Sequence, residues 1–177
     1  MVRSQLIPGR GRLAARVSHP SLPFPGNVSG LFYSIEIPVG FDLNAVPDDP
    51  EFFPDKDARG LPKSELGLDH ISLGLTSWRG LSGQEFVFPV NPAPGYIDGS
   101  IYLQATHNWA DVTRLRFGDL HPSAIALSLD VAFDFSMLNA APATLARAMP
   151  VTWDVIIDVD VAELDRQMTL AENVLSR

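Results

Sequence analysis

The eleven residues from Ile125 to Phe135 alternate large apolar side chains with small or acidic ones, without an interruption. Successive side chains of a β-strand point to opposite faces of the sheet, so a period of two places all the large apolar groups on one face. The pattern therefore predicts a strand with one buried face and one solvated face. Residues 153–161 repeat it, with apolar side chains at every odd position. These two segments indicate a substantial β-sheet and say little about chemistry.

Shorter alternating segments predict five further strands, at residues 31–37, 71–76, 86–90, 101–106 and 112–117. A helical stripe from Val161 to Leu175 predicts a C-terminal helix, and Asp160 stands at its N-cap position. Pro142 favours a second helix within residues 136–150. The sequence thus predicts a mainly β (α+β) fold, either an antiparallel β-sandwich or a strongly curved sheet of about seven strands with one or two helices.

Three segments that lack a clear period are predicted to be irregular. Residues 1–30 combine arginines with several prolines and glycines, which predicts a basic, irregular N-terminal arm before a single β-rich domain at residues 31–177. The fold is expected to survive removal of the first 18 residues. Residues 40–69 contain four prolines and many charges and are predicted to form a long loop. Residues 107–111 are predicted to form a turn between two strands.

Charge is unevenly distributed along the chain. Residues 1–35 contain four arginines and no acid, whereas residues 36–177 hold the other nine basic residues and all 21 acids, a net charge of −12. An acidic body repels nucleic acid and favours a basic partner. The chain has no cysteine, which excludes disulfides and thiolate metal sites and suits a reducing cytoplasm. It also has no apolar run of the ~18 residues that a membrane-spanning helix needs.

The histidines and the aspartates near them are the first candidates for catalytic residues. His70 follows Asp69 where the long predicted loop meets a strand, and His107 and Asp111 share a predicted turn. A His/Asp set of this kind would serve a small hydrolase or a ligand-binding domain, although the same residue types often cap turns through their own backbone.

Metal and cofactor motifs are not apparent. Residues 55–60 resemble the start of a calcium-binding EF-hand loop, but Arg59 and Leu66 occupy positions five and twelve, where oxygen ligands are required. The chain also lacks the His-Glu-x-x-His spacing of zinc proteases and a glycine-rich phosphate cradle after a strand. Neither a metal nor a cofactor is expected.

The favoured function is a non-enzymatic protein-interaction domain with an acidic surface. Trp and Arg are enriched at interface hot spots, so Trp78, Arg79 and Trp109 are the predicted contact residues. Inhibitors and toxin-neutralising immunity proteins share this acidic, cysteine-free profile, and the partner is predicted to be a basic protein or another copy of the chain. The alternative is a small hydrolase or ligand-binding β-sandwich that uses His70, His107 and Asp111.

Overall fold

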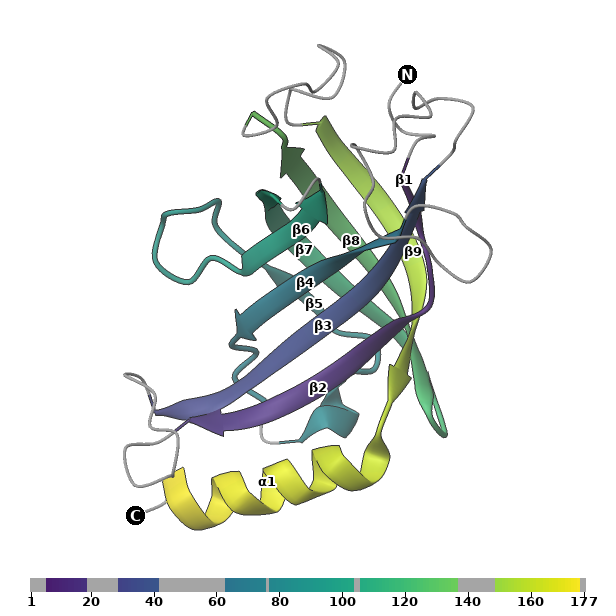
Figure 1. The fold of residues 1–177 in the computed structure, drawn as a ribbon. Coiled ribbons are helices and arrows are strands. Elements are labelled where there is room, and N and C mark those ends of the chain that lie inside the picture. The colour runs from purple at the N-terminus through teal and green to yellow at the C-terminus, as the bar shows by residue number, and fades with distance from the viewer. Residues whose placement is uncertain are drawn as a thin grey trace.

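The computed structural model describes residues 6–18, 29–41, 63–75, 77–103, 106–136 and 149–175. Its elements, shown in Figure 1, are β1 (Leu6–Pro8), β2 (Gly11–Ser18), β3 (Gly30–Phe41), β4 (Lys63–Ile71), η2 (Trp78–Leu81), β5 (Glu85–Val87), β6 (Asp98–Leu103), β7 (Thr106–His121), β8 (Ala124–Asp134), β9 (Met149–Val159) and α1 (Val161–Leu175). The strand order is β1, β3, β2, β9, β8, β7, β6, β4, and β4 returns to pair with β3. Seven strands, β2 to β4 and β6 to β9, therefore close into a barrel.

This closure makes the β-sandwich prediction wrong, whereas the strongly curved, mainly β sheet is broadly right. A sandwich needs two separate sheets, each with free edges. Here β3 pairs through one edge with β2 and through the other with β4, so the sheet returns to its own starting strand. Closure removes the exposed strand edges that would otherwise favour aggregation.

The N-terminal segment contains two strands, so the prediction of an irregular arm is corrected for residues 6–18. β2 pairs antiparallel with β3 and parallel with β9, and the second pairing closes the barrel. Its alternate side chains Leu13, Ala15 and Val17 are buried. The alternation is short and lies among prolines and glycines, which conceals it in the sequence. Residues 1–5 and 19–28 lie outside the described residues.

A β-bulge explains why β4 was predicted in the wrong place. The sequence predicts a loop up to residue 69 and a strand over 71–76, but β4 occupies residues 63–71. Its buried residues are Leu66, Leu68 and Ile71, so the inward spacing changes from two to three. His70 has φ of 57° at that point, and the register with β3 shifts there. An extra residue breaks the period of two on which the sequence argument depends. The rest of the predicted loop, residues 42–62, lies outside the described residues.

The predicted turn at residues 107–111 is part of the 16-residue strand β7. Its register with β8 shifts twice, between Val112 and Arg114 and between Phe117 and Leu120, so its alternation is interrupted. The strand predicted from residue 153 begins earlier, at Met149, and includes Pro150. The predicted helix over 136–150 falls largely on residues 137–148, outside the described residues.

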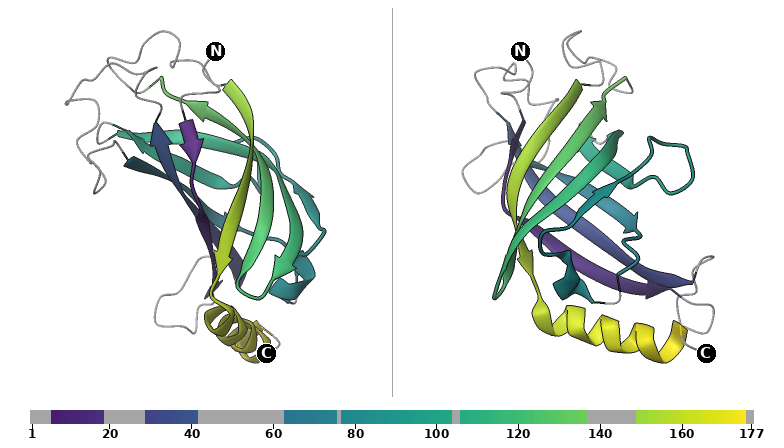
Figure 2. Two further views of the ribbon diagram at one scale, coloured as in Figure 1. Left: turned by 90° about the vertical axis from the view of Figure 1, so that its right-hand side faces the viewer. Right: turned by 180° about the vertical axis from the view of Figure 1, so that it is seen from behind.

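Helix α1 covers one end of the barrel, where β9 ends and β2 and β3 meet (Figure 2). The predicted C-terminal helix is confirmed, and Asp160 accepts a hydrogen bond from the backbone N–H of Glu163 (3.1 Å), as an N-cap does. Leu164 and Met168 are buried against the strands, and Gln167 Oε1 accepts a hydrogen bond from Val17 N. No helix among the described residues is long and apolar enough to cross a membrane.

The barrel interior is apolar except for two polar side chains on the described strands. The large residues of 125–135 are all buried, as predicted, and Trp153, Val155, Ile157 and Val159 line the interior beside them. Tyr33 and Asn108 are buried among these groups, and the Tyr33 hydroxyl and Asn108 Oδ1 have no hydrogen-bond partner. Burial raises the pKa of Tyr33 to about 12.

Candidate functional site

An exposed aromatic cluster lies on the outer side of β6 and β7. Tyr102 pairs with His107 across the two strands, and Trp109 pairs with Ser100 one step further along. The rings of Tyr102 and His107 are 5.0 Å apart. Tyr102 is 59% exposed and Trp109 is 56% exposed, although both are large and mostly apolar. We call Tyr102, His107 and Trp109 the aromatic face.

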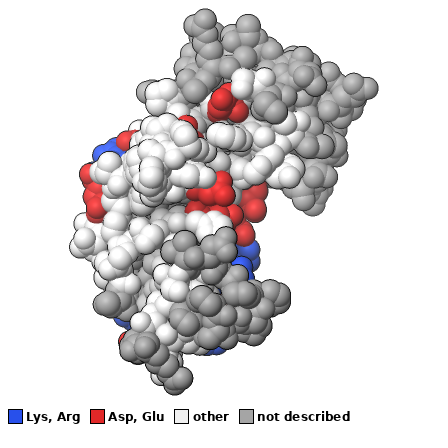
Figure 3. Space-filling model, turned by 90° about the vertical axis from the view of Figure 1, so that its left-hand side faces the viewer, with Lys and Arg blue, Asp and Glu red and all other residues white. Residues whose placement is uncertain are grey.

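Carboxylates surround the aromatic face because the neighbouring outward positions are acidic. Asp134 on β8 lies directly opposite Trp109. Asp69 on β4 pairs with Asp98 on β6, and Asp111 on β7 lies two residues beyond Trp109 on the same face. The side of the barrel formed by β4 and β6 carries Asp and Glu near its middle, whereas the visible Lys and Arg lie toward its margins (Figure 3). The aromatic face therefore has an acidic surrounding.

The residues of the predicted His/Asp site lie on two strands, His70 on β4 and His107 with Asp111 on β7. His107 and Asp111 are four residues apart on one strand, which separates them by roughly 13 Å along β7. His70 lies on β4 and makes an edge-to-face contact with Phe32. Asp111 accepts a hydrogen bond from Asn91 N (3.2 Å), and no hydrogen bond between described residues joins the three side chains. These groups offer no assembled acid–base pair.

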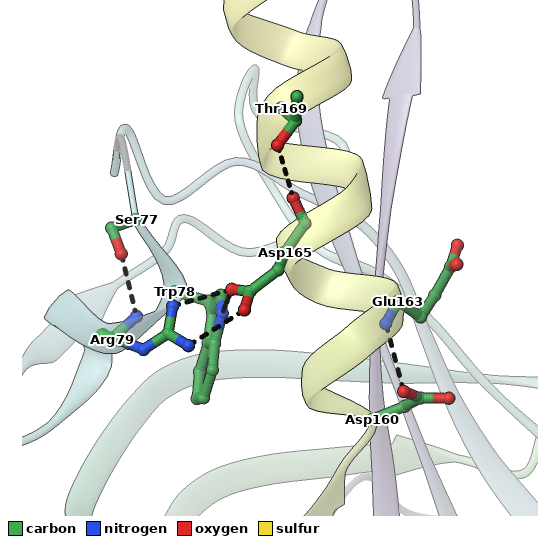
Figure 4. A network of polar contacts seen from close by, with 7 residues as sticks. All are labelled: Ser77, Trp78, Arg79, Asp160, Glu163, Asp165 and Thr169. Carbon is green, nitrogen blue, oxygen red and sulfur yellow. Dashed lines mark hydrogen bonds and ion pairs between the residues drawn. The ribbon is translucent and has the colours of Figure 1, made fainter.

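Trp78 and Arg79, two of the three predicted contact residues, fasten α1 to the barrel (Figure 4). Trp78 is only 2% exposed, and its Nε1 donates a hydrogen bond to Asp165 (2.8 Å). Arg79 donates two more hydrogen bonds to the same carboxylate (2.7 and 2.9 Å) and lies 4.5 Å from the Trp78 ring centroid. The hydrogen bonds from Arg79 and then from Trp78 lower the pKa of Asp165 to about 2. We call these three residues the helix latch.

A shallow groove lies elsewhere on the barrel wall, across β7, β8 and β9. Arg116, Ser128 and Asp154 face one another on the three strands, and Ile156, which is 41% exposed, forms part of the rim. The groove has a volume of about 290 Å³. The alternation over residues 153–161 places Asp154 at an even, solvated position, and its side chain is exposed. Among the described residues, no group of three His, Asp or Glu side chains is placed to hold a metal ion.

Sequence reasoning found Trp109 but missed Tyr102. The signal was present, because Tyr102 alternates with Ile101 and therefore belongs to the outward face of its strand. Tyr102 lies near Trp109 because β6 pairs with β7, and this pairing cannot be read from the sequence. Comparisons with protein-family models, curated proteins and solved structures found no match for this chain. The site must therefore be interpreted from its own chemistry.

Proposed function

We propose that this chain is a protein-interaction domain that binds a basic partner protein through the aromatic face. The observation that carries the proposal is the exposure of Trp109 and Tyr102 on neighbouring strands, with Asp111 and Asp134 at the outward positions next to Trp109. Trp and Tyr are enriched at interfaces because each offers a large apolar surface and a polar tip at low conformational cost. Such a pair on a sheet surface is a suitable anchor for a partner.

The negative charge near the aromatic face favours a basic partner. Asp98, Asp111 and Asp134 lie close to the anchor, and residues 36–177 carry a net charge of −12. Lysine and arginine side chains around an apolar contact would pair with these carboxylates at the rim of the interface. Long-range attraction would also accelerate encounter, as it does for other complexes of opposite charge. A basic protein fits this surface better than an acidic one or a nucleic acid.

The test begins with capture of partners from the native host on the immobilised full-length protein. Trp109→Ala removes the anchor, and Ile156→Ala is the matched control because it removes an exposed apolar side chain from a different part of the barrel. We expect a basic protein that is retained by the unchanged protein and by Ile156→Ala but lost with Trp109→Ala. Equal retention by all three proteins would contradict the proposal, as would the capture of acidic partners alone.

Kinetics with the captured partner supply the second part of the test. Raising the salt concentration from 0.1 M to 1 M shortens the Debye length from about 10 Å to about 3 Å. The association rate should therefore fall with salt, while Trp109→Ala should mainly increase the dissociation rate. His107→Ala should have a smaller effect because its ring lies beside Tyr102 rather than forming the anchor. An association rate that is independent of salt would remove the electrostatic part of the proposal.

A further inference from the structure

Two surface charges of opposite sign lie in one row on the barrel wall formed by β7, β8 and β9. Arg116 on β7 pairs with Ser128 on β8, and Ser128 pairs with Asp154 on β9. Figure 2 shows these three strands side by side. Adjacent strands are about 4.8 Å apart, so the Cα atoms of Arg116 and Asp154 are separated by roughly 10 Å. Only the small side chain of Ser128 lies between the two charges.

Other charges on this wall are paired within the chain, but these two are not. Asp130, at the next outward position of β8, accepts two hydrogen bonds from Arg114 (2.8 and 3.2 Å). Glu85 on β5 lies opposite Arg116, yet its ion pair is with Arg114 (3.7 Å). Arg116 acts on Asp130 only at longer range, and among the described residues the side chains of Arg116 and Asp154 form no hydrogen bond or ion pair.

The next row on this wall is apolar, with a bulky side chain on one strand and none on another. Ile156 on β9 lies opposite Ala126 on β8 and is 41% exposed. Gly118 on β7 is the neighbour of Ala126 on the other side, since a Cβ atom on Gly118 would lie 3.1 Å from the Cβ of Ala126. The two rows together line the groove of about 290 Å³. The groove is therefore hollow toward β7 and bounded by Ile156 on β9.

A second copy of the chain complements both rows. A two-fold axis that runs along β8, between two facing copies, places β7 of one copy over β9 of the other. Arg116 then faces Asp154 of the second copy, because the two residues lie in one row on opposite sides of β8. In the same way, Ile156 faces the space that Gly118 leaves. Each contact occurs twice, as in any interface that joins the same surface of two subunits.

We propose that the wall formed by β7, β8 and β9 is a dimer interface, in which Arg116 pairs with Asp154 of a second copy across a two-fold axis. Charge favours a second copy over other occupants. A strongly basic or strongly acidic partner would leave one of the two charges facing its own sign, whereas the two-fold contact pairs both. The row is also neutral, although the chain has a net charge of −8. This wall is separate from the aromatic face on β6 and the start of β7, so either proposal can fail without the other.

Sedimentation equilibrium of the full-length protein tests the interface. We expect a monomer–dimer equilibrium with a Kd between micromolar and millimolar, as small interfaces give. Arg116→Asp brings like charges together at two places in the dimer and should raise the Kd by about 10-fold or more. The double variant Arg116→Asp/Asp154→Arg restores the pair with its charges exchanged and should return the Kd to within about 3-fold of the original.

Arg16→Asp is the control for net charge. Arg16 is exposed on β2, so this variant changes the charge of the chain as Arg116→Asp does but should leave the Kd unchanged. Three results would overturn the proposal. They are a protein that stays monomeric at millimolar concentration, a Kd that Arg116→Asp alters no more than Arg16→Asp, and a double variant that dimerises as weakly as Arg116→Asp alone.

Chemical cross-linking locates the axis without any change of charge. The chain has no cysteine, so Ser128→Cys introduces a single thiol at the position through which the axis passes. Facing sheets pack about 10 Å apart, a distance that a short bismaleimide can span. Ser34→Cys is the matched control, because Ser34 is half-buried like Ser128 but lies on β3. We expect a cross-linked dimer with Ser128→Cys and little with Ser34→Cys. Equal yields, or a higher yield with Ser34→Cys, would overturn the proposal.

Discussion

Asp165 joins α1 to η2 through its carboxylate. Its carboxylate accepts three hydrogen bonds from two neighbouring residues of η2, Trp78 and Arg79. The ionised carboxylate accepts such bonds more strongly than the protonated acid does, and the arrangement therefore couples the docking of a helix to a single protonation. Trp78 is buried in this contact, whereas the Arg79 side chain remains 55% exposed, and the predicted role of the two residues in binding a partner stays a prediction.

The helix latch should make stability depend on pH in the acid range. The pKa of Asp165 is lowered to about 2, from an ordinary value of 3.8. A lowered folded-state pKa gives stability that is complete above the unfolded value and is lost as pH falls through the folded value. Thermal melts between pH 4 and pH 2 should thus show a loss of stability that is smaller in Asp165→Asn. The pKa of Glu163 is also lowered to about 2, but its ion pair with Arg166 lies within α1. Glu163→Gln is therefore compared with Asp165→Asn as a variant that removes an acid of the same helix outside the helix latch. Parallel curves for Asp165→Asn and the unchanged protein would contradict this role.

Gly11 is required by a close approach of three strands. A Cβ atom there would lie 2.6 Å from Ile157 Cδ1 and 2.8 Å from the carbonyl oxygen of Glu36. Gly11→Ala should therefore destabilise the protein by about 1–3 kcal/mol, as overpacked sites do. Gly67→Ala is the control, because its nearest neighbour would be Ser100 Oγ at 3.9 Å. Denaturant titrations of both variants measure the difference, and equal stabilities would show that β2 and β9 move apart without strain.

Strand β8 has one face in the core and one face toward solvent. Its inward residues form the middle of the core, and its outward residue Asp130 accepts hydrogen bonds from Arg114 on β7 and Thr152 on β9. The hydrogen bonds from Arg114 and then Thr152 lower the pKa of Asp130. The outward face therefore ties three strands together through a partly exposed polar contact.

The two faces of β8 should differ in their contribution to stability. Leu129→Ala removes a completely buried side chain and should reduce the free energy of unfolding by about 2–5 kcal/mol. Asp130→Ala should reduce it by about 1 kcal/mol or less, because solvent screens an ion pair that is about one-third exposed. Urea titrations of the two variants compare these values. A loss with Asp130→Ala as large as with Leu129→Ala would mean that the polar contacts of β8 matter as much as its core face.

At the scale of the whole molecule, the barrel depends on its N-terminal strand. β2 is the only link between β3 and β9 among the described residues, so its removal leaves two open edges. Residues 1–30 have the appearance of a dispensable arm in the sequence, but Gly11–Ser18 form β2, whose buried side chains belong to the barrel core. The strand that closes the sheet comes from one terminus and its parallel partner from near the other.

Deletion of residues 1–18 should therefore damage the fold. The loss includes the buried side chains Leu13 and Val17, each of which contributes about 1.5–3 kcal/mol, and this corresponds to a melting temperature lower by ~10 °C or more. Circular dichroism melts of the truncated and full-length proteins test this. A synthetic peptide of residues 1–18 added to the truncated protein should recover part of the loss. A truncated protein that melts within a few degrees of the full chain would show that the barrel is stable when open.

Elements with a local side-chain pattern could be predicted from the sequence. The alternation at 125–135, the apolar face of 153–159 and the C-terminal helix with its Asp160 cap are all present in the structure. Each depends on the positions of side chains a few residues apart, and a strand or a helix face can be read from those positions alone. Trp109 also could be selected, because its residue type favours interfaces.

Tertiary structure alone decided what depends on pairing between distant segments. The bulge at His70 interrupts the period of two in β4. The start of β7 escaped recognition because its buried positions hold Asn108 and Ala110, whereas the large Trp109 is exposed. Closure through β2 and β9, and the register that places Tyr102 opposite His107 and Trp109 opposite Asp134, join residues that the chain separates. Local periodicity indicates which face of a strand is buried. The neighbour on each edge of a strand depends instead on hydrogen bonding between strands and on the free energy of closing the sheet.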